Sequence, residues 1–551
     1  MVSERGILLF IMHRTITAAL GSSALALISS MSLAGSPPDQ WRDRIVYEIF
    51  VRSFQDNATG SLANDGIGDI PGLISKLDYL NDGNPRTSSD LGVSAIWLMP
   101  IHPSPSYHGY DITDYKAINP EYGTIEDFKT LVAECRKRGI EVMIDLVINH
   151  TSDKHPWFIE AMNPESPMRD RYIWSATDPG WKGPWNQIVW HKRGDQWLYG
   201  LFYHAMPDLN FRNDDVTREV RDIVNFWTMD IGVTGLRLDA IRHLIEEGQV
   251  QENTPSTLKW LGEFQSHIRQ ATPQVFTIGE VWSPSKDSAR YVPAAMDATF
   301  DFELATAMMN AAKSGDATGL RTKEREVIGL YPSGGYGRFL TNHDQNRVMS
   351  ELNGDEGKAR AAAALLLTGP GVPFVYYGEE IGMKGAKPDE LIRTPMQWEG
   401  VEGGGFTLGK PWQPFASDAS TRSVRAMDHS SDSLISLYRE LVSLRNKFKS
   451  LSRGETIVLE CEEKAVHALL RSSPGHPPVI TIVNVGAKPI AEVKLTCEGS
   501  ALTGVYRVST LKGDYFRTFD AKFGTGGGLT YVLNDAPLPA YGCAVFVLTR
   551  N

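Results

Sequence analysis

Eight short apolar segments alternate with helical segments along most of the chain, and this alternation restricts the fold more than any other feature. Strands that are separated by helices form parallel sheets with both faces covered. Eight such units predict an α/β fold in which the strands close into a (β/α)8 TIM barrel. The helix at 433–448 is the last of this barrel. The predicted strands lie at 45–54, 93–100, 140–148, 233–239, 275–282, 298–302, 337–341 and 373–377.

Two stretches break the alternation. Residues 151–210 are rich in Trp, Pro, Gly and Asp and show no helical period. A long irregular insertion after a strand is usually functional, so we expect an excursion domain that overhangs the site. Short alternating runs over 456–548 predict a C-terminal antiparallel β domain. The expected barrel consists of two parts, residues 41–150 and 211–450. The excursion domain between them spans 151–210, and a C-terminal β-sandwich domain spans 451–551.

The N-terminus is typical of a secretory signal, which we place at residues 1–34. His13 and Arg14 precede an apolar run of small residues at 16–33, and Ser32-Leu33-Ala34 fits a small-x-small cleavage site. An uncleaved membrane anchor is the alternative, but the run is short and rich in Ser and Gly. We therefore expect an exported protein, secreted or periplasmic, that leaves the membrane after cleavage. Translation could start at Met1 or at Met12.

Charge and cysteine content narrow the partners. A net charge of −11 argues against nucleic acid or an anionic membrane as the main partner, and it is compatible with a neutral ligand such as a sugar. Cys135 lies on an apolar helix face and is expected to be a buried thiol. One disulfide among Cys461, Cys497 and Cys543 is possible in an oxidising compartment, but the sequence does not choose the pair.

Polar and charged residues gather where four of the predicted strands end. One of these ends carries an Arg-x-Asp pattern, which in isolation is most often a surface ion pair. Polar and charged residues at four strand ends of the same barrel are hard to explain as separate surface ion pairs. Because the carboxyl ends of barrel strands meet on one face, we expect these side chains to form the active site. They are Asn149 and His150 after the third strand, Arg237 and Asp239 in the fourth, Glu280 in the fifth, and His343 and Asp344 after the seventh.

Three carboxylates without a metal-binding pattern suit the hydrolysis of a glycoside. A retaining enzyme needs a nucleophile and a separate acid/base. Asp239 beside Arg237 should stay ionised and act as the nucleophile. Glu280 has apolar neighbours in sequence, which favour a raised pKa and the role of acid. Asp344 would bind sugar hydroxyls and favour an oxocarbenium-like transition state, with His150 and His343 donating to the same ring.

The sequence strings DLVINH, GLRLDAIRH, GEVW and TNHD resemble four signature regions of the α-amylase family, glycoside hydrolase family 13, in order and in spacing. The resemblance runs from about Trp41 to the C-terminus. It implies Asp239 as nucleophile, Glu280 as acid/base and Asp344 as transition-state stabiliser. It also implies Tyr110, in HGYDITDY, as the aromatic platform under the sugar at subsite −1, and sugar contacts for Arg237 and His243.

Three features bear on the activity within the family. Met206-Pro-Asp-Leu-Asn210 resembles a group intermediate between oligo-1,6-glucosidases and neopullulanases, which includes bacterial α-amylases. Tyr107 stands where α-glucosidases have an Asp that closes the site, so the cleft is expected to be open. Arg242-His243 resembles the Lys-His pair of α-amylases. We therefore expect an endo-acting α-amylase that cleaves α-1,4 bonds of starch or maltooligosaccharides, active as a monomer.

The alternatives are an α-glucosidase, or a neopullulanase with transglycosylation. A non-catalytic relative, such as a transporter heavy chain, is disfavoured because all three carboxylates are present.

The loop DNATGSLANDGIGD resembles the Asp-rich Ca2+ loop of the family. Oxygen ligands on a Gly-containing loop suit Ca2+. The alternative is a solvated turn. The resemblance implies a structural Ca2+ held by Asp56, Asn64, Asp65, the Ile67 carbonyl and Asp69.

Overall fold

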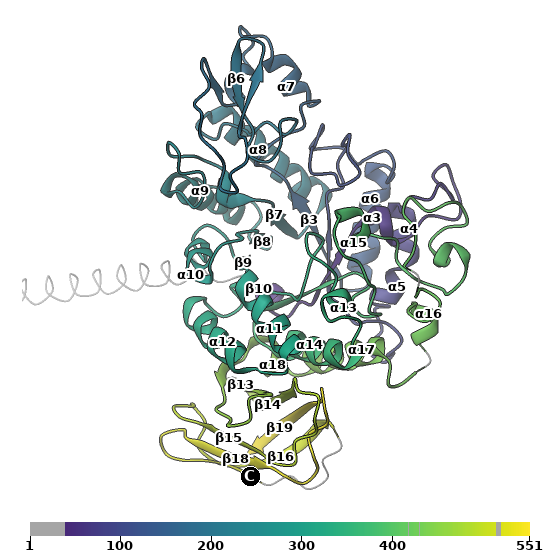
Figure 1. Ribbon diagram of the computed structural model, residues 1–551, viewed down its shortest axis with the longest axis vertical. Helices are drawn as coiled ribbons and strands as arrows, with labels where there is room; N and C mark the ends of the chain where they lie inside the picture. Colours follow the sequence, from purple (N-terminus) through teal and green to yellow (C-terminus); the bar gives the residue numbers. More distant parts are fainter. Residues whose placement is uncertain (1–38, 417, 429, 514–519, 551) are drawn as a thin grey trace, which may run out of the picture.

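A closed barrel of eight parallel strands forms the centre of the structure, a computed structural model that describes residues 39–416, 418–428, 430–513 and 520–550 (Figure 1). The strand order around the barrel is β1-β11-β10-β9-β8-β7-β3-β2. The predicted (β/α)8 barrel is confirmed. The predicted signal at 1–34 lies outside the described residues. The barrel strands are β1 (Val46–Ile49), β2 (Ala95–Leu98), β3 (Glu141–Leu146), β7 (Gly235–Leu238), β8 (Phe276–Gly279), β9 (Ala298–Phe300), β10 (Tyr336–Arg338) and β11 (Val372–Tyr376).

Most barrel strands are shorter than their apolar segments. The first predicted strand, 45–54, ends at Ile49 and continues as the short helix α3 (Val51–Phe54). Val51 and Phe54 are as buried as the strand itself. An apolar run that is buried throughout gives no period from which to locate the change from strand to helix.

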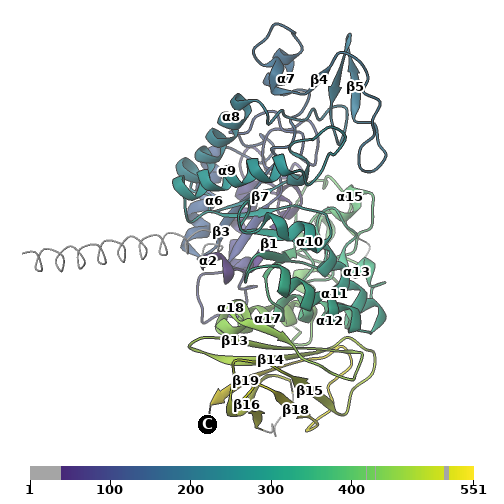
Figure 2. The same cartoon turned by 90° about the vertical axis from the view of Figure 1, so that its left-hand side faces the viewer.

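Helices surround the barrel, as Figure 2 shows from a second direction. Helix α6 (Ile125–Lys137) illustrates how the sequence sets their limits. The Thr124 side chain accepts a hydrogen bond from the Asp127 N–H, and the Asp127 side chain accepts from the Thr124 N–H, so the capping box is complete. The other longer helices are α8 (Asp214–Asn225), α9 (Pro255–Ala271), α11 (Phe302–Ser314), α12 (Thr318–Leu330), α14 (Glu356–Thr368) and α17 (Leu434–Lys447).

Shorter helices fill the connections. Helix α8 continues as a π-helical turn, η2 (Phe226–Ile231), and η3 (Ile241–His243) follows the end of β7. The remaining short helices are α2 (Asp39–Arg42), α4 (Ile70–Ser75), α5 (Leu77–Leu80), α7 (Pro156–Ala161), α10 (Ser285–Ser288), α13 (Val348–Glu351), α15 (Asp389–Ile392), α16 (Val424–Met427) and α18 (Lys449–Arg453). In the described part of the chain, no helix is both long and apolar enough to cross a membrane.

The segment between β3 and α8 projects beyond the carboxyl ends of the barrel strands (Figure 1). It contains α7 and a three-stranded antiparallel sheet of β4 (Trp174–Ser175), β6 (Gln196–Tyr199) and β5 (Trp190–Arg193). Its two ends are tied together where they leave the barrel. The Asn149 side chain donates to Asp208 at 2.9 Å, and the Leu209 N–H donates to the Asn149 carbonyl at 2.9 Å.

The C-terminal segment forms an antiparallel sheet at the opposite end of the barrel, as predicted (Figures 1 and 2). Its eight strands form one sheet rather than the two separate sheets of a sandwich. A bridge between Glu460 and Thr496 joins its two edges around a separate apolar core. The strands are β12 (Glu455–Val458), β13 (Val466–Ser473), β14 (His476–Asn484), β15 (Val493–Cys497), β16 (Gly504–Lys512), β17 (Ala521–Phe523), β18 (Leu529–Leu533) and β19 (Cys543–Arg550).

Buried arginines join this sheet to the barrel. Arg321 of α12 donates to the carbonyls of Cys461, Glu463 and Val466 at 3.0–3.2 Å. Arg471 of β13 is 1% exposed and donates to the carbonyl at the end of α14, that of Thr368, at 3.2 Å. These contacts satisfy loop carbonyls on both sides of the junction, so the sheet completes the closed end of the barrel.

The four cysteines are free thiols in the structure, and all four belong to its described part. Cys135 is fully buried on the inner face of α6, as predicted. The three C-terminal cysteines, among which the sequence allowed one disulfide, form none in the described part of the chain.

Candidate active site

Two neighbouring strands, β7 and β8, deliver the two central carboxylates to the open end of the barrel. Asp239 follows β7 directly, and its N–H still donates to the Leu146 carbonyl of β3. Glu280 follows β8 in the same way, with its N–H donating to the Leu238 carbonyl. The parallel ladder thus continues one residue beyond the strands and fixes both side chains on one face.

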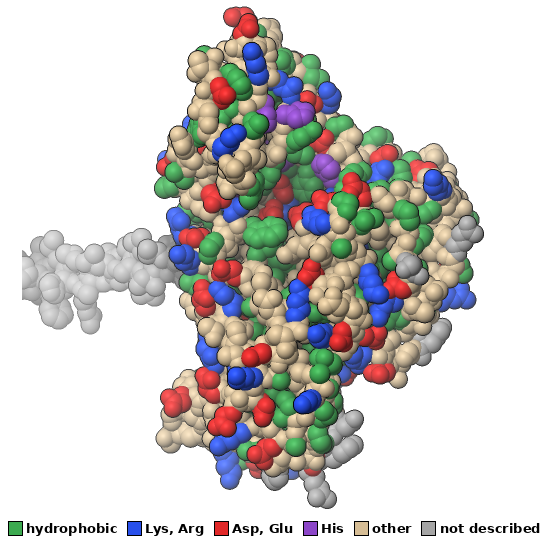
Figure 3. All heavy atoms as spheres, in the orientation of Figure 1, with side chains coloured by type: hydrophobic (Ala, Val, Ile, Leu, Met, Phe, Trp, Pro, Cys, Tyr) green, Lys and Arg blue, Asp and Glu red, His purple; other side chains and the backbone are tan. Residues whose placement is uncertain are grey.

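A cleft of about 360 Å³ opens over these carboxylates. It lies between the excursion segment and the barrel, and Figure 3 shows the hollow with acidic side chains at its floor. All three predicted catalytic carboxylates line it, and so do the predicted substrate residues Tyr110, His150 and His243. The full lining is His108, Tyr110, His150, Trp185, Phe202, Met206, Asp239, Ala240, Arg242, His243, Glu280, Trp282, Asp344, Asp389 and Arg393.

Arg237 connects the carboxylates from below. One guanidinium nitrogen, Nη1, donates to Asp239 at 2.7 Å and to Asp145 at 2.9 and 3.0 Å. The other, Nη2, donates to Glu280 at 2.7 Å. The side chain is 1% exposed and lies over the ring of Trp97. Arg237 therefore does not line the cleft, as a substrate contact would, but holds the nucleophile and acid candidates in place.

Burial raises the pKa of both central carboxylates, including Asp239, for which the sequence predicted a carboxylate kept ionised by Arg237. Burial raises the pKa of Glu280 to about 7, Arg237 opposes this, and the charges of Asp239 and Asp344 add to it. Burial also raises the pKa of Asp239, and the Arg237 guanidinium is again the main opposing influence. A carboxyl group with a pKa near 7 is partly protonated at neutral pH and can donate a proton to a leaving group.

A pH profile tests this assignment. We expect kcat/KM to fall as the pH rises through about 7, because the acid form of Glu280 is present below its raised pKa and is lost above it. The measurement is the initial rate on a maltooligosaccharide at low substrate concentration from pH 4 to 9. A value of kcat/KM that does not fall between neutral pH and pH 9 would contradict the role of Glu280 as the acid.

Asp344 lies on the other side of the cleft, within a network of buried groups. Arg393 Nη2 donates to one carboxylate oxygen at 2.9 Å, and His343 Nε2 lies 3.2 Å from the other. His343 also contacts the Tyr110 hydroxyl at 2.6 Å, while its Nδ1 lies 2.5 Å from Glu48 of β1. The Tyr110 hydroxyl donates in turn to Asp145 at 3.1 Å.

This network keeps Asp344 ionised. Burial acts to raise the pKa of Asp344, but His343, Arg393 and Arg237 together lower it below the ordinary value. Burial acts to lower the pKa of His343, but Asp344 and Glu48 outweigh burial and raise it. His343 is fully buried and does not line the cleft. Like Arg237, it lies beneath the cleft and contacts a carboxylate that lines it. The predicted sugar contacts of both residues stay predictions.

The arrangement has one carboxyl group poised to donate a proton and two carboxylates beside it, all on one cleft. The family model described as "Alpha amylase, catalytic domain" matches residues 48–454, which include every residue of this arrangement. The chain belongs to the α-amylase family. It is a glycoside hydrolase of that family and acts on α-glucans.

Individual members of the family show the same relationship. The chain is 37% identical over 433 residues to alpha-amylase 3 of Dictyoglomus thermophilum, covering 78% of this chain and 82% of that protein. It is 31% identical over 530 residues to the oligo-1,6-glucosidase of Parageobacillus thermoglucosidasius, covering 81% and 91%. The crystal structure of an alpha-amylase from H. orenii superposes with a TM-score of 0.79 at 38% identity, over 92% of this chain and 99% of that one.

The remaining predicted sugar contacts are neutral histidines. Burial lowers the pKa of His150 to about 4, and its Nε2–H donates to the Tyr110 carbonyl. Burial lowers the pKa of His243 to about 3, with Arg242 adding to the effect. Its Nδ1–H donates to the Gln251 carbonyl at 2.8 Å, and its Nε2 accepts from Arg242 at 2.9 Å. Both ring nitrogens of His243 are therefore used within the protein.

Several residues that line the cleft or support it from below were not predicted from the sequence. Glu48 could have been found, because it is an acidic residue inside the apolar run IVYEIF. Trp185, Phe202 and Asp389 could not, since they lie in irregular segments whose position relative to the strand ends depends on the folded chain. Trp282 was noted only as an apolar neighbour of Glu280.

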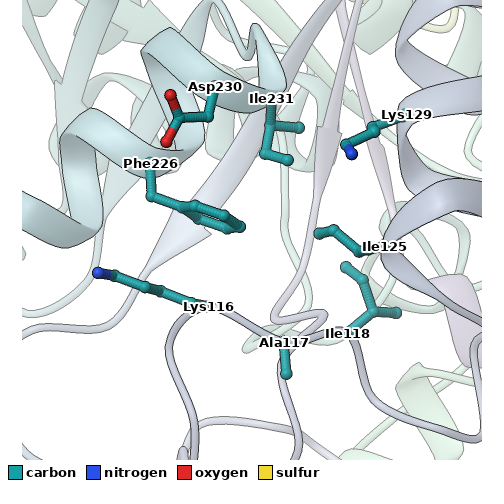
Figure 4. Close-up of a pocket in the computed structure, with 8 residues that line it drawn as sticks. All are labelled: Lys116, Ala117, Ile118, Ile125, Lys129, Phe226, Asp230 and Ile231. Carbon is teal, nitrogen blue, oxygen red and sulfur yellow. The ribbon is translucent and has the colours of Figure 1, made fainter.

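A second cavity, of about 450 Å³, lies on the flank of the barrel between α6, η2 and the loop at 116–118 (Figure 4). Ile118, Ile125 and Phe226 form much of its wall, and Asp230 is its one carboxylate. It contains none of the predicted site residues. Without a second carboxylate it cannot perform acid-assisted nucleophilic substitution, so we assign catalysis to the cleft.

The acidic loop after α3 places its carboxylates close together. Asp56 and Asp69 are buried, and neither forms an ion pair within the described residues. Burial raises the pKa of Asp69 to about 6, the loop N–H donors oppose this, and Asp56 and Asp65 add to it. Burying ionised carboxylates without a basic partner costs free energy, and a bound cation would remove that cost.

The loop also satisfies part of its own hydrogen bonding. Asp56 accepts from the N–H groups of Asn64 and Gly66, and Asp69 caps α4 at Gly72. Asp65 accepts from the Ile67 N–H. Across the described residues, no three His, Cys, Asp or Glu side chains converge as a metal site. A Ca2+ ion here would fit only if main-chain oxygens, such as the Ile67 carbonyl, complete its ligands.

Proposed function

We propose that this protein is an endo-acting α-amylase that cleaves internal α-1,4 bonds with retention of anomeric configuration. The observation that carries the proposal is the single guanidinium of Arg237, which binds Asp239 on one nitrogen and Glu280 on the other. Such a fork favours the short carboxylate spacing of a retaining enzyme over the wider gap that an inverting enzyme leaves for water.

Each carboxylate then has one role. Glu280 donates a proton to the glycosidic oxygen while Asp239 attacks the anomeric carbon, so that the leaving sugar departs and a glycosyl ester forms on Asp239. Glu280, now a carboxylate, takes a proton from the incoming water, which breaks the ester and releases the product. Ionised Asp344 stabilises the positive charge that develops on the sugar ring in both steps.

The endo preference is supported by Tyr107, which replaces the Asp expected in an exo-acting α-glucosidase, and by the two named α-amylases among the relatives. A second candidate, an α-glucosidase, is favoured by one observation. Arg393 also pairs with Asp389 at 3.2 Å, and Asp389 pairs with Lys387. Arg393 and Asp389 both line the cleft, and Arg393 also pairs with Asp344, so charged side chains border the cleft beside this carboxylate.

A time course on maltoheptaose separates the two candidates. An endo-acting enzyme releases a mixture of short maltooligosaccharides early, in the α configuration when followed by NMR. Early release of glucose alone would establish the α-glucosidase. Pullulan and isomaltose, assayed in parallel, report whether α-1,6 bonds or a neopullulanase activity are involved.

We also propose that the loop of Asp56, Asn64, Asp65, Ile67 and Asp69 holds a structural Ca2+. Saturating Ca2+ should raise the Tm of EDTA-treated protein by about 2–5 °C, because binding to the folded state alone stabilises it. Thermal denaturation with and without Ca2+ measures this. The rise should disappear in Asp65→Ala. An equal rise in both proteins, or none in either, would contradict the site.

We further propose export with removal of residues 1–34, and action as a monomer. The sequence pattern of the N-terminus supports the first. N-terminal sequencing of secreted material and light scattering test them. A mature N-terminus before Met31 would contradict the predicted cleavage.

A further inference from the structure

The leaving-group side of the cleft can be identified from the acid. Glu280 must face the glycosidic oxygen, so the departing sugar lies on the side of the cleft that Glu280 borders. The Ala240 N–H donates to Glu280 at 3.2 Å, and Arg242, His243 and Trp282 follow Ala240 and Glu280 in the chain. Tyr110, Asp344 and Arg393 form a separate group in the cleft lining, joined through His343 and Asp344.

Two tryptophans on the leaving-group side expose large parts of their rings. Trp185 of the excursion segment is 54% exposed, and Trp282 after β8 is 45% exposed. Both line the cleft. An exposed aromatic ring costs free energy in water unless a ligand covers it, and exposed apolar surface beside a site marks a binding surface. The apolar face of a glucose ring suits such a platform.

The Trp185 ring is held in place before any ligand binds. It lies in a tight turn in which the Asn186 N–H donates to the Gly183 carbonyl at 2.9 Å. The main-chain N–H of Trp185 donates to the side-chain oxygen of Gln187 at 2.9 Å. The side-chain nitrogen of Gln187 donates in turn to the Leu201 carbonyl at 3.1 Å. The indole ring packs edgewise on His243 and lies 5.8 Å from the Phe202 ring.

Arg242 links the two tryptophans. Its guanidinium carbon lies 5.8 Å from the centre of the Trp185 ring, a cation–π contact. The same guanidinium donates to the Trp282 carbonyl and, at 3.1 Å, to the Ser283 hydroxyl. Glu252 pairs with it at 3.2 Å. Arg242 is thereby committed to the protein and sets the positions of both aromatic platforms instead of binding sugar itself.

We propose that Trp185 is the specificity-determining platform for the sugar on the leaving-group side, and that Arg242 is the residue that positions it. The ligand class is a glucose-containing saccharide, either as the departing part of a substrate or as an acceptor. An acceptor on this platform attacks the anomeric carbon of the Asp239 ester with its hydroxyl oxygen. The ester bond breaks, and the hydroxyl proton passes to Glu280. This inference rests on the proposed glycosidase function.

The test compares a substrate whose leaving group is a sugar with one whose leaving group is fluoride. With maltoheptaose, whose leaving group covers the platform, Trp185→Ala should lower kcat/KM by about 10–100-fold, as expected for the loss of a buried aromatic anchor. With α-glucosyl fluoride, whose leaving group cannot reach Trp185, the loss should be at least tenfold smaller. Trp185→Phe, which keeps an aromatic face, should restore most of the maltoheptaose activity.

A transfer assay gives a second measurement. With α-glucosyl fluoride as donor and maltose as acceptor, Trp185→Ala should lower the ratio of transfer product to free glucose by about tenfold. Arg242→Lys should lower the same ratio to a smaller extent, because lysine cannot make the two bonds of the guanidinium while also lying over the ring.

Tyr203→Ala is the matched control, since Tyr203 is an aromatic residue of the same segment, 55% exposed, that does not line the cleft. It should change neither kcat/KM on maltoheptaose relative to α-glucosyl fluoride nor the ratio of transfer product to free glucose. Equal losses on both substrates in Trp185→Ala, or no loss on either, would overturn the inference. A wild-type protein inactive on both substrates would refute the proposed function instead, so the two failures are distinguishable.

Discussion

Asp239→Asn should lower kcat for maltoheptaose by about 10⁴-fold or more, the order of loss seen when a catalytic carboxylate is replaced by its amide. The amide oxygen of asparagine cannot form the glycosyl ester on which the two-step reaction depends. The loss should appear on α-glucosyl fluoride as well, because an activated leaving group does not replace a nucleophile. Steady-state rates on the two substrates measure this.

Folding should survive the substitution. Asparagine keeps the shape of the side chain, its amide oxygen can still accept from Arg237, and Arg237 keeps Asp145 and Glu280 as ionic partners. We therefore expect the thermal denaturation midpoint to stay within a few degrees of that of the wild type. Asp114→Asn is a suitable control, since Asp114 is an exposed aspartate that does not line the cleft. Activity of Asp239→Asn within tenfold of the wild type would refute the assignment of the nucleophile.

Glu280→Gln is expected to separate the two substrates. On maltoheptaose, kcat/KM should fall by about 10³-fold, because glutamine cannot protonate the departing sugar oxygen. On α-glucosyl fluoride the loss of kcat/KM should be less than about tenfold, since fluoride departs without a proton and kcat/KM reports only the step that forms the ester. The alkaline limb of the wild-type profile should disappear in the variant.

Azide provides the complementary measurement for Glu280→Gln. It attacks the ester without needing a base, so it should raise kcat on the fluoride and yield a glucosyl azide of the α configuration. A β product would indicate inversion, and comparable losses on both substrates would show that Glu280 does not act as the acid.

The barrel and its rim were largely predictable from the sequence because both follow from short-range patterns. Apolar runs that alternate with helical periods require a parallel sheet, and a parallel barrel brings all strand ends to one face. Asp239, Glu280 and Asp344 follow their strands within a few residues, so their meeting in one cleft did not depend on loop geometry. The capping box of α6 likewise depends on two residues only three positions apart, Thr124 and Asp127.

Other features depended on contacts that sequence patterns do not encode. Arg237 and His343 were expected to touch sugar, but both lie beneath the cleft, because the depth of a side chain depends on how the neighbouring strands pack. The engagement of both ring nitrogens of His243 follows from the path of residues 242–251, which has no periodic pattern. Likewise, the meeting of Trp185 with Arg242 is set by the fold of an irregular segment.

The arginines at the closed end of the barrel bear on how the protein can be divided. The family match ends at residue 454, yet one guanidinium nitrogen of Arg321 in the barrel donates to three carbonyls at 461–466. Its neighbour Arg338 pairs with Glu324, and both are fully buried there. A chain ended after the catalytic segment would open this charged layer to solvent and leave carbonyls and guanidinium groups to find new partners. The C-terminal sheet is thus an integral part of the catalytic unit, not an appended module that could be exchanged or deleted.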